Sequence, residues 1–121
     1  MSVKIIAEIG INHNGDISIC KRMIDNAILA GCDYVKFQKR NPDVCVPEDQ
    51  KSKLRKTPWG EMTYLEYKWK IEFGQDEYDE IDRYCKEKEI GWFASAWDIP
   101  SVDFLKQYGA KGIIKIPSAL I

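Results

Sequence analysis

The feature that most constrains the fold is a regular alternation of short apolar runs with helical patterns. Residues 3–9 (VKIIAEI) are rich in β-branched side chains and predict a strand, and residues 10–16 (GINHNGD) predict a loop. From Ile17 onward, apolar side chains recur at helical spacing, and Asp16 can cap the start of that helix. Residues 34–38 (YVKFQ) then predict a second strand. The start of the chain therefore predicts a β-α-β unit.

The same alternation returns in the second half of the chain. Patterns there predict a helix around residues 78–85, a strand at 90–95, a helix from Pro100 and a fourth strand at 112–116. Strands that alternate with helices pair in parallel, and the helices cover the outer face of the sheet. We therefore expect one α/β domain, for which 121 residues with 45% hydrophobic side chains provide a single core.

A long tract of irregular sequence, residues 39–74, separates the second strand from the next helix. Within it, the segment 63–66 fits a capping box, and Leu65, Trp69 and Phe73 recur at helical spacing. We expect an ordered insertion that contains a short helix with an apolar face and lies beside a site.

Charge and cysteine usage exclude several classes of protein. The formal net charge is -1, and basic and acidic side chains are interspersed, so we expect neither a nucleic-acid partner nor a membrane partner. The four cysteines form no CxxC pair, and no apolar leader or membrane-spanning run is present. These features predict reduced thiols in a cytoplasmic protein.

Charged and amide side chains lie in the C-terminal halves of three predicted strands. Glu8 belongs to the first strand, Lys36 and Gln38 share one face of the second, and Lys115 belongs to the fourth. Ligands of α/β folds bind at this edge of the sheet. A buried ammonium group needs a carboxylate partner or an anionic ligand, and Glu8 can neutralise only one of the two lysines. The sequence therefore predicts a site for a small phosphorylated acid.

Further donors are available for such an anion. They are the hydroxyl groups of Ser95 and Ser118 and the backbone N–H groups of the loop at residues 10–15.

Each of these side chains also has an ordinary structural interpretation. Lys36 and Lys115 can lie at strand ends and reach solvent, and Glu8 can form a purely structural ion pair. His13, the only histidine, can order the turn or touch a substrate, and one histidine cannot form a metal site. We expect the four tryptophans to serve packing rather than to form a sugar platform.

Five segments carry a more specific signal: AEIGINHNGD, VKFQ, TPWGEMTYLEYKWKIEF, FASAWD and KIPSA. In this order and spacing they resemble the sialic acid synthase family, which comprises N-acetylneuraminate synthases and the related legionaminic acid, pseudaminic acid and spore-coat polysaccharide synthases. The resemblance implies a (β/α)8 TIM barrel, of which this chain would hold about the first four strands and three βα units.

The resemblance also implies a reaction in surface-carbohydrate biosynthesis. Phosphoenolpyruvate would condense with an open-chain N-acyl amino sugar such as N-acetylmannosamine, giving a nine-carbon 2-keto sugar acid and phosphate. A divalent metal ion, manganese or magnesium, would polarise the sugar aldehyde as a Lewis acid.

Carried over position by position, the family's motifs imply roles for five residues. Glu8 would transfer a proton or position a water molecule, and Lys36 would meet the phosphoenolpyruvate anion. Gln38 would meet the sugar or metal-bound water, whereas Lys115 and Ser118 would lie on the phosphoenolpyruvate side.

One position departs from the family pattern. Some members place a phosphate-contacting threonine at the end of the third strand, where this chain has Ala96 after Ser95. Ser95 is therefore a substitute candidate for that contact.

Members of the family are longer than this chain. The second half of their barrel, their metal-binding histidines and a C-terminal antifreeze-like domain that completes the sugar site across a homodimer lie beyond the matching segments. We therefore expect residues 1–121 to be the N-terminal half of such a barrel, and to be inactive alone.

Two other functions remain open at this point. A Schiff-base aldolase would use Lys36 or Lys115 as its nucleophile. A non-catalytic chain would act only as a binding or assembly partner.

Overall fold

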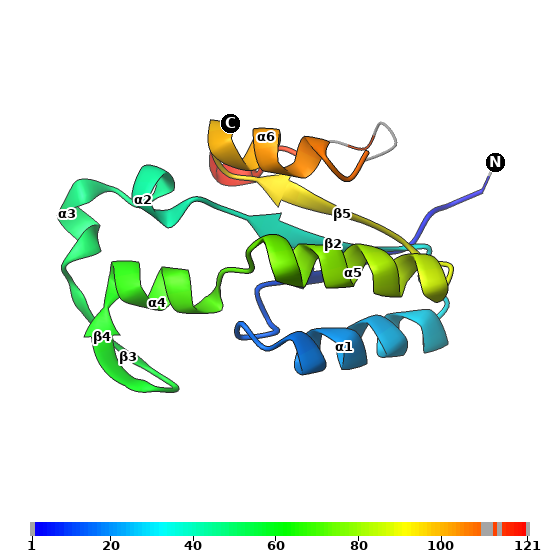
Figure 1. Cartoon of the computed structure of the whole chain (residues 1–121), viewed down its shortest axis with the longest axis horizontal. Helices are drawn as coiled ribbons and strands as arrows, with labels where there is room; N and C mark the ends of the chain where they lie inside the picture. The colour runs from blue at the N-terminus through cyan, green and yellow to red at the C-terminus, as the bar shows by residue number, and fades with distance from the viewer. Residues whose placement is uncertain (1, 110–112, 114, 121) are drawn as a thin grey trace.

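The computed structural model describes residues 2–109, 113 and 115–120, and shows an α/β fold (Figure 1). Its main sheet has three parallel strands in the order β1-β2-β5. They are β1 (Ile6–Gly10), β2 (Tyr34–Lys39) and β5 (Gly91–Ala96). The predicted alternation is confirmed, although the first strand begins at Ile6 rather than at Val3.

Helices follow the strands as predicted: α1 (Ile17–Leu29), α5 (Gln75–Glu87) and α6 (Ile99–Lys106). Helix α1 begins after Asp16 because the side chain of Asp16 accepts hydrogen bonds from the backbone N–H groups of Ser18 and Ile19. Helices α1 and α5 lie side by side on one face of the sheet (Figure 1). None of the helices in residues 2–109 or the other described positions is long and apolar enough to span a bilayer.

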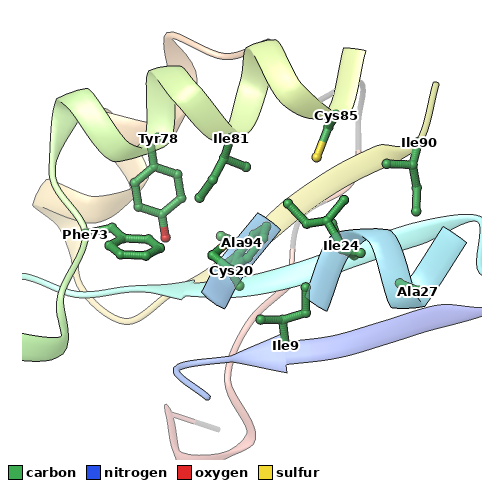
Figure 2. Packing of buried hydrophobic residues seen from close by; sticks show 12 residues of the cluster. Ile9, Cys20, Ile24, Ala27, Phe73, Tyr78, Ile81, Cys85, Ile90 and Ala94 are labelled. Atoms are coloured by element: carbon green, nitrogen blue, oxygen red, sulfur yellow. The ribbon is translucent and has the colours of Figure 1, made fainter. Parts of the chain in front are cut away.

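The hydrophobic core lies between these two helices and the sheet (Figure 2). Val35 and Phe37 of β2 are fully buried beneath the helices, so the alternate residues of that strand lie on the opposite face. Trp92 packs against Phe37 and Tyr78, which agrees with a packing role for this tryptophan.

All four cysteines are unpaired, as predicted. Cys20 of α1 and Cys85 of α5 lie in the core, where burial raises the pKa of each thiol to about 12. Protonated, buried thiols of this kind act as small hydrophobic side chains.

The insertion after β2 is ordered, as predicted, and lies beyond the carboxyl ends of β2 and β5 (Figure 1). Its elements are α2 (Pro42–Cys45), α3 (Glu48–Lys51), β3 (Leu54–Thr57), β4 (Gly60–Thr63) and α4 (Tyr64–Ile71). Strands β3 and β4 form an antiparallel hairpin that the sequence did not predict, because its charged, exposed strands lack a clear apolar alternation.

The short helix within the insertion starts as predicted but buries a different face. The Thr63 hydroxyl accepts a hydrogen bond from the backbone N–H of Glu66, and α4 ends at Ile71. Phe73 therefore lies beyond the helix, in the core, while Trp69 is 44% exposed. The predicted apolar face was wrong, because the buried residues of α4 are Lys68 and Ile71 and the helix ends two residues before Phe73.

The predicted fourth strand lies partly outside the described residues, at 112 and 114. Lys115 forms an isolated parallel bridge with Ser95 of β5, which agrees with parallel pairing at this position. Ser118–Leu120 form a short 3-10 helix, η1.

Candidate active site

The centre of the candidate site is an ion pair between neighbouring strands. The register of β1 and β2 places Glu8 opposite Lys36, and the Lys36 Nζ atom lies 2.8 Å from Glu8 Oε1. Lys36 Nζ also donates to Ser95 Oγ at 2.6 Å and to the Phe37 carbonyl at 3.3 Å. The structure thus brings together three of the residues that the sequence placed at this edge of the sheet, Glu8, Lys36 and Ser95.

The two partners differ in their access to solvent. Lys36 is only 5% exposed, so the interpretation of this lysine as a strand-end residue reaching solvent was wrong. The Glu8 side chain is 61% exposed. The cluster is therefore a buried cation whose carboxylate partner faces solvent.

Gly10 keeps this side of the sheet open. It has a φ of 57°, and the β1 register shifts between Glu8 and Gly10. A Cβ atom at Gly10 would lie 3.5 Å from Gln38 Nε2 and 3.8 Å from Glu8 Oε1. The Gln38 amide and the Glu8 carboxylate thus border the same small space.

Lys115 and Ser118 lie nearby in the topology but not in this cluster. The Lys115 ammonium donates to the Ile116 carbonyl at 3.1 Å, and Ser118 is exposed at the start of η1. Among the described residues, neither side chain hydrogen bonds to Glu8 or Lys36, and Lys115 has no carboxylate partner.

His13 orders the loop after β1, in agreement with its structural interpretation. Its ring stacks on Phe73 at 3.9 Å, its Nδ1 atom accepts from the Gly15 N–H at 3.0 Å, and it is 2% exposed. Burial lowers the pKa of His13 to about 4, so the ring is neutral at physiological pH.

The backbone N–H groups of this loop were predicted to be donors for an anion, and that prediction was wrong for three of them. The N–H of Asn12 donates to Ile9, that of Asn14 to Ile11 and that of Gly15 to His13. The turn uses these groups for its own hydrogen bonds.

A second ion pair, with both partners buried, lies on the other face of β2 and was not predicted from the sequence. Lys39 Nζ is 3.1 Å from Glu72 Oε1, donates to the Phe73 carbonyl at 3.1 Å and lies 4.8 Å from the Phe104 ring centroid. Burial raises the pKa of the Glu72 carboxyl, an effect larger than the opposing one of Lys39. No local pattern identifies this pair, because its members lie 33 positions apart.

Arg40 is the other residue near the site that sequence reasoning missed. Its Nη2 atom donates to Gln38 Oε1 at 2.9 Å, and its Cζ atom lies 3.8 Å from the centroid of the Trp97 ring. The available signal was the two-residue period of strands, which places Arg40 in line with Lys36 and Gln38.

The described residues do not offer a metal centre. None of their histidine, cysteine, aspartate and glutamate side chains form a group of three or more that could hold an ion. Glu8 is paired with Lys36, and His13 is buried with one nitrogen engaged. The metal ion implied by the sequence resemblance therefore finds no ligand set here.

Comparisons with known proteins agree with the motifs. The pattern of the NeuB family matches residues 23–121. The N,N'-diacetyllegionaminic acid synthase of Campylobacter jejuni is 34% identical over 97% of this chain and 35% of its own length. The human N-acetylneuraminate-9-phosphate synthase is 41% identical over 85% of this chain and 29% of its own length.

A solved structure shares the fold. The N-acetylneuraminic acid synthetase of Leptospira borgpetersenii, crystallised with citrate, superposes with a TM-score of 0.78 and 32% identity, over 96% of this chain and 36% of that one. The chain thus spans about a third of the length of the relatives it matches. Its sequence and its fold both show that the chain belongs to the NeuB family, and the relatives to which it is similar are sialic and legionaminic acid synthases.

Proposed function

We propose that this chain forms the phosphoenolpyruvate side of a sialic acid synthase-type active site. The whole enzyme would condense phosphoenolpyruvate with an N-acyl amino sugar, giving a 2-keto sugar acid and phosphate for carbohydrate biosynthesis. The observation that carries this proposal is the cluster of Lys36, Glu8 and Ser95 at the carboxyl edge of parallel strands. Family membership supports it.

We propose that the sheet is one arc of a (β/α)8 TIM barrel. The strands β1, β2 and β5 follow one another in chain order, and the bridge between Ser95 and Lys115 continues this parallel order. The face that carries Glu8, Lys36 and Gln38 would be the barrel interior. In the whole protein, a second half-barrel, a C-terminal antifreeze-like domain and a homodimer partner would complete the site.

The side chains at this strand edge suit the binding of an anion with two charged ends. Among the described residues Lys115 has no carboxylate partner, so the cluster and its neighbour together carry one surplus positive charge. Ser95 accepts its hydrogen bond from Lys36, which leaves the hydroxyl proton free for a substrate oxygen. Lys115 and Ser118 would meet the far end of the same anion.

Glu8 would exchange its partner when the anion enters. Phosphoenolpyruvate would take the place of Glu8 beside the Lys36 ammonium, which is possible because Glu8 lies at the solvent side of the pair. The released carboxylate would hold a proton or a water molecule near C2 of the substrate. In the condensation, C3 of phosphoenolpyruvate would form the new bond to the aldehyde carbon of the sugar, and water would add at C2 and give up a proton. The C2–O bond would then break, with its electron pair leaving on phosphate.

A divalent ion, manganese or magnesium, would supply Lewis-acid polarisation of the sugar aldehyde. Because the described residues hold no group of three or more candidate ligands, at least part of its ligand set would come from elsewhere in the whole protein. No step assigned to Glu8, Lys36 or Ser95 depends on it.

The structure gives less support to a Schiff-base aldolase. A lysine ammonium has three protons, and Lys36 directs its Nζ atom at three acceptors: Glu8, Ser95 and the Phe37 carbonyl. This is the environment of a cation that donates hydrogen bonds rather than of a free amine nucleophile. If pyruvate and borohydride labelled Lys36 covalently, the aldolase function would replace our proposal.

The direct test is an assay of phosphate release from phosphoenolpyruvate by the whole protein, with manganese and a panel of N-acyl hexosamines. We expect release that depends on one of the sugars and that Lys36→Met lowers strongly. If no sugar in the panel supports release, the proposed function is wrong.

A further inference from the structure

Arg40 lies directly beyond β2 and is held from three directions. Its Nη2 atom donates to Gln38 Oε1, its guanidinium stacks on Trp97, and its backbone N–H donates to Glu72 Oε1 at 3.0 Å. The Trp97 backbone N–H in turn donates to the Lys39 carbonyl at 3.0 Å. A planar guanidinium that is stacked on an indole ring and bonded at one edge has little freedom to move.

The contacts of Arg40 do not serve to neutralise its charge. Within the described part of the chain its guanidinium forms no ion pair with a carboxylate, and its one side-chain hydrogen bond goes to Gln38. The hydrogen bond from this guanidinium therefore serves mainly to hold the Gln38 amide.

Arg40 determines which way that amide points. A guanidinium group can only donate hydrogen bonds, so the atom facing it must be the Gln38 oxygen. The Gln38 nitrogen is then directed away from Arg40, toward Gly10, where a Cβ atom would lie 3.5 Å from Nε2. The same point is 3.8 Å from Glu8 Oε1.

The Gln38 nitrogen has no partner of its own in the described structure. The amide oxygen is engaged with Arg40, whereas Nε2 donates no hydrogen bond to any described residue. Because Gly10 has no side chain, the point that a Cβ atom would occupy in front of this donor has no atom closer than Nε2 itself, at 3.5 Å.

We propose that Arg40 is a positioning residue that fixes the Gln38 amide, so that Gln38 presents a hydrogen-bond donor beside the Glu8 carboxylate. This donor selects an oxygen acceptor on the ligand. An amide nitrogen neither binds a metal ion nor accepts a hydrogen bond. A metal-bound water directs its oxygen lone pair at the ion and its protons outward, so it is a poor partner for a donor. Gln38 would therefore contact a hydroxyl or carbonyl oxygen of the amino sugar rather than metal-bound water. The choice of ligand rests on the proposed function, whereas the orientation of the amide does not.

The orientation is tested by NMR spectroscopy on this chain, without substrate. We expect nuclear Overhauser contacts between the Gln38 side-chain amide protons and the Gly10 α-protons. Arg40→Ala should abolish them. Arg55→Ala is the matched control, because Arg55 also stacks on an aromatic ring, that of Tyr64 at 4.8 Å, but lies in the hairpin.

The role in binding is tested by steady-state kinetics on the whole protein. Loss of one hydrogen bond predicts that Arg40→Ala raises KM for the amino sugar about tenfold while KM for phosphoenolpyruvate changes little. Gln38→Glu should do the same, because its carboxylate still accepts from Arg40 but no longer donates. This second variant keeps the contact with Arg40 and so guards against a folding defect in the first.

The outcomes separate the two proposals. Unchanged Gln38–Gly10 contacts in Arg40→Ala would overturn the positioning role, as would a Gln38→Glu protein with a normal KM for the sugar. An absence of condensation activity in the unmodified protein would overturn the proposed function alone, since the NMR result would still decide how the amide is held.

Discussion

Lys36 and Lys39 are two buried lysines of one strand, and their surroundings differ. Both pair with a glutamate, and both ammonium groups reach three oxygen acceptors. Because they are three positions apart, they lie on opposite faces of β2. The Lys39 pair is closed, since the side chains of Lys39 and Glu72 are 9% and 4% exposed. The Lys36 pair is open on the side of Glu8.

This difference separates a structural ion pair from one that can exchange a partner. The closed pair ties the end of β2 to the link between α4 and α5, and aromatic rings cover its cation. Nothing can enter without disrupting the core. In the open pair an anion can approach through the exposed carboxylate, at the edge where α/β proteins bind ligands.

The largest effect is expected from breaking the closed pair. Glu72→Ala leaves Lys39 buried without its carboxylate, which lowers the free energy of unfolding by about 3–5 kcal/mol. Urea denaturation of this chain measures the loss. Glu87→Ala, at an exposed pair with Arg83, is the control, and the double variant with Lys39→Met should recover much of the stability. Equal midpoints for the Glu72 and Glu87 variants would show that the pair is not closed.

The second prediction concerns the protonation of the buried His13 ring at low pH. The pKa of buried His13 is lowered to about 4, whereas an unfolded histidine titrates near 6.5. Between these values the unfolded state binds a proton that the native state rejects. Stability is therefore highest above pH 6.5 and falls by about 3 kcal/mol as pH decreases to 4.

The measurement is the free energy of unfolding as a function of pH, for the unmodified chain and for His13→Asn. Carboxylates that titrate in the same range contribute to both profiles, so the difference isolates His13. We expect the variant to lack this part of the slope, and parallel profiles would contradict a buried, neutral histidine.

The third prediction concerns the open pair. Lys36→Met keeps most of the length of the side chain but removes its charge, and the exposed Glu8 is left in water rather than buried. We expect binding of phosphoenolpyruvate to weaken about 10- to 100-fold, which corresponds to roughly 1.4–2.7 kcal/mol. Isothermal titration calorimetry of the whole protein with phosphoenolpyruvate measures this change in affinity. Lys86→Met, which removes an exposed lysine of α5 paired with Asp82, should bind normally, and equal losses in both variants would make Lys36 merely structural.

The shared strand edge of Glu8 and Lys36 could be predicted from the sequence, whereas the closed pair could not. The two-residue period places Lys36 on the face opposite the apolar residues Val35 and Phe37, and strands in parallel bring Glu8 to its side. These are local rules. In the sequence, Lys39 resembles an ordinary polar residue at the end of the strand. Its partner, Glu72, lies in a loop whose position local patterns do not determine.

The same distinction explains the errors in the insertion. The cap at Thr63 is local and was predicted. The end of α4 depends instead on tertiary contacts, because the Glu72 carboxylate just beyond the helix accepts hydrogen bonds from the Lys39 ammonium and the backbone N–H of Arg40. The stacking of Arg40 on Trp97 likewise joins the ends of two strands. Contacts between distant segments therefore decided the features that sequence patterns missed.

The smallest effect is expected from the carboxylate of the open pair. In Glu8→Gln the amide oxygen still accepts from Lys36, and water reaches this position because the side chain is 61% exposed. The free energy of unfolding should therefore fall by less than about 1 kcal/mol, far less than in Glu72→Ala. Urea denaturation of both variants under one buffer gives the comparison directly. A loss at Glu8 as large as that at Glu72 would mean that Glu8 is committed to holding the sheet, and a carboxylate so committed could not leave Lys36 to an incoming anion.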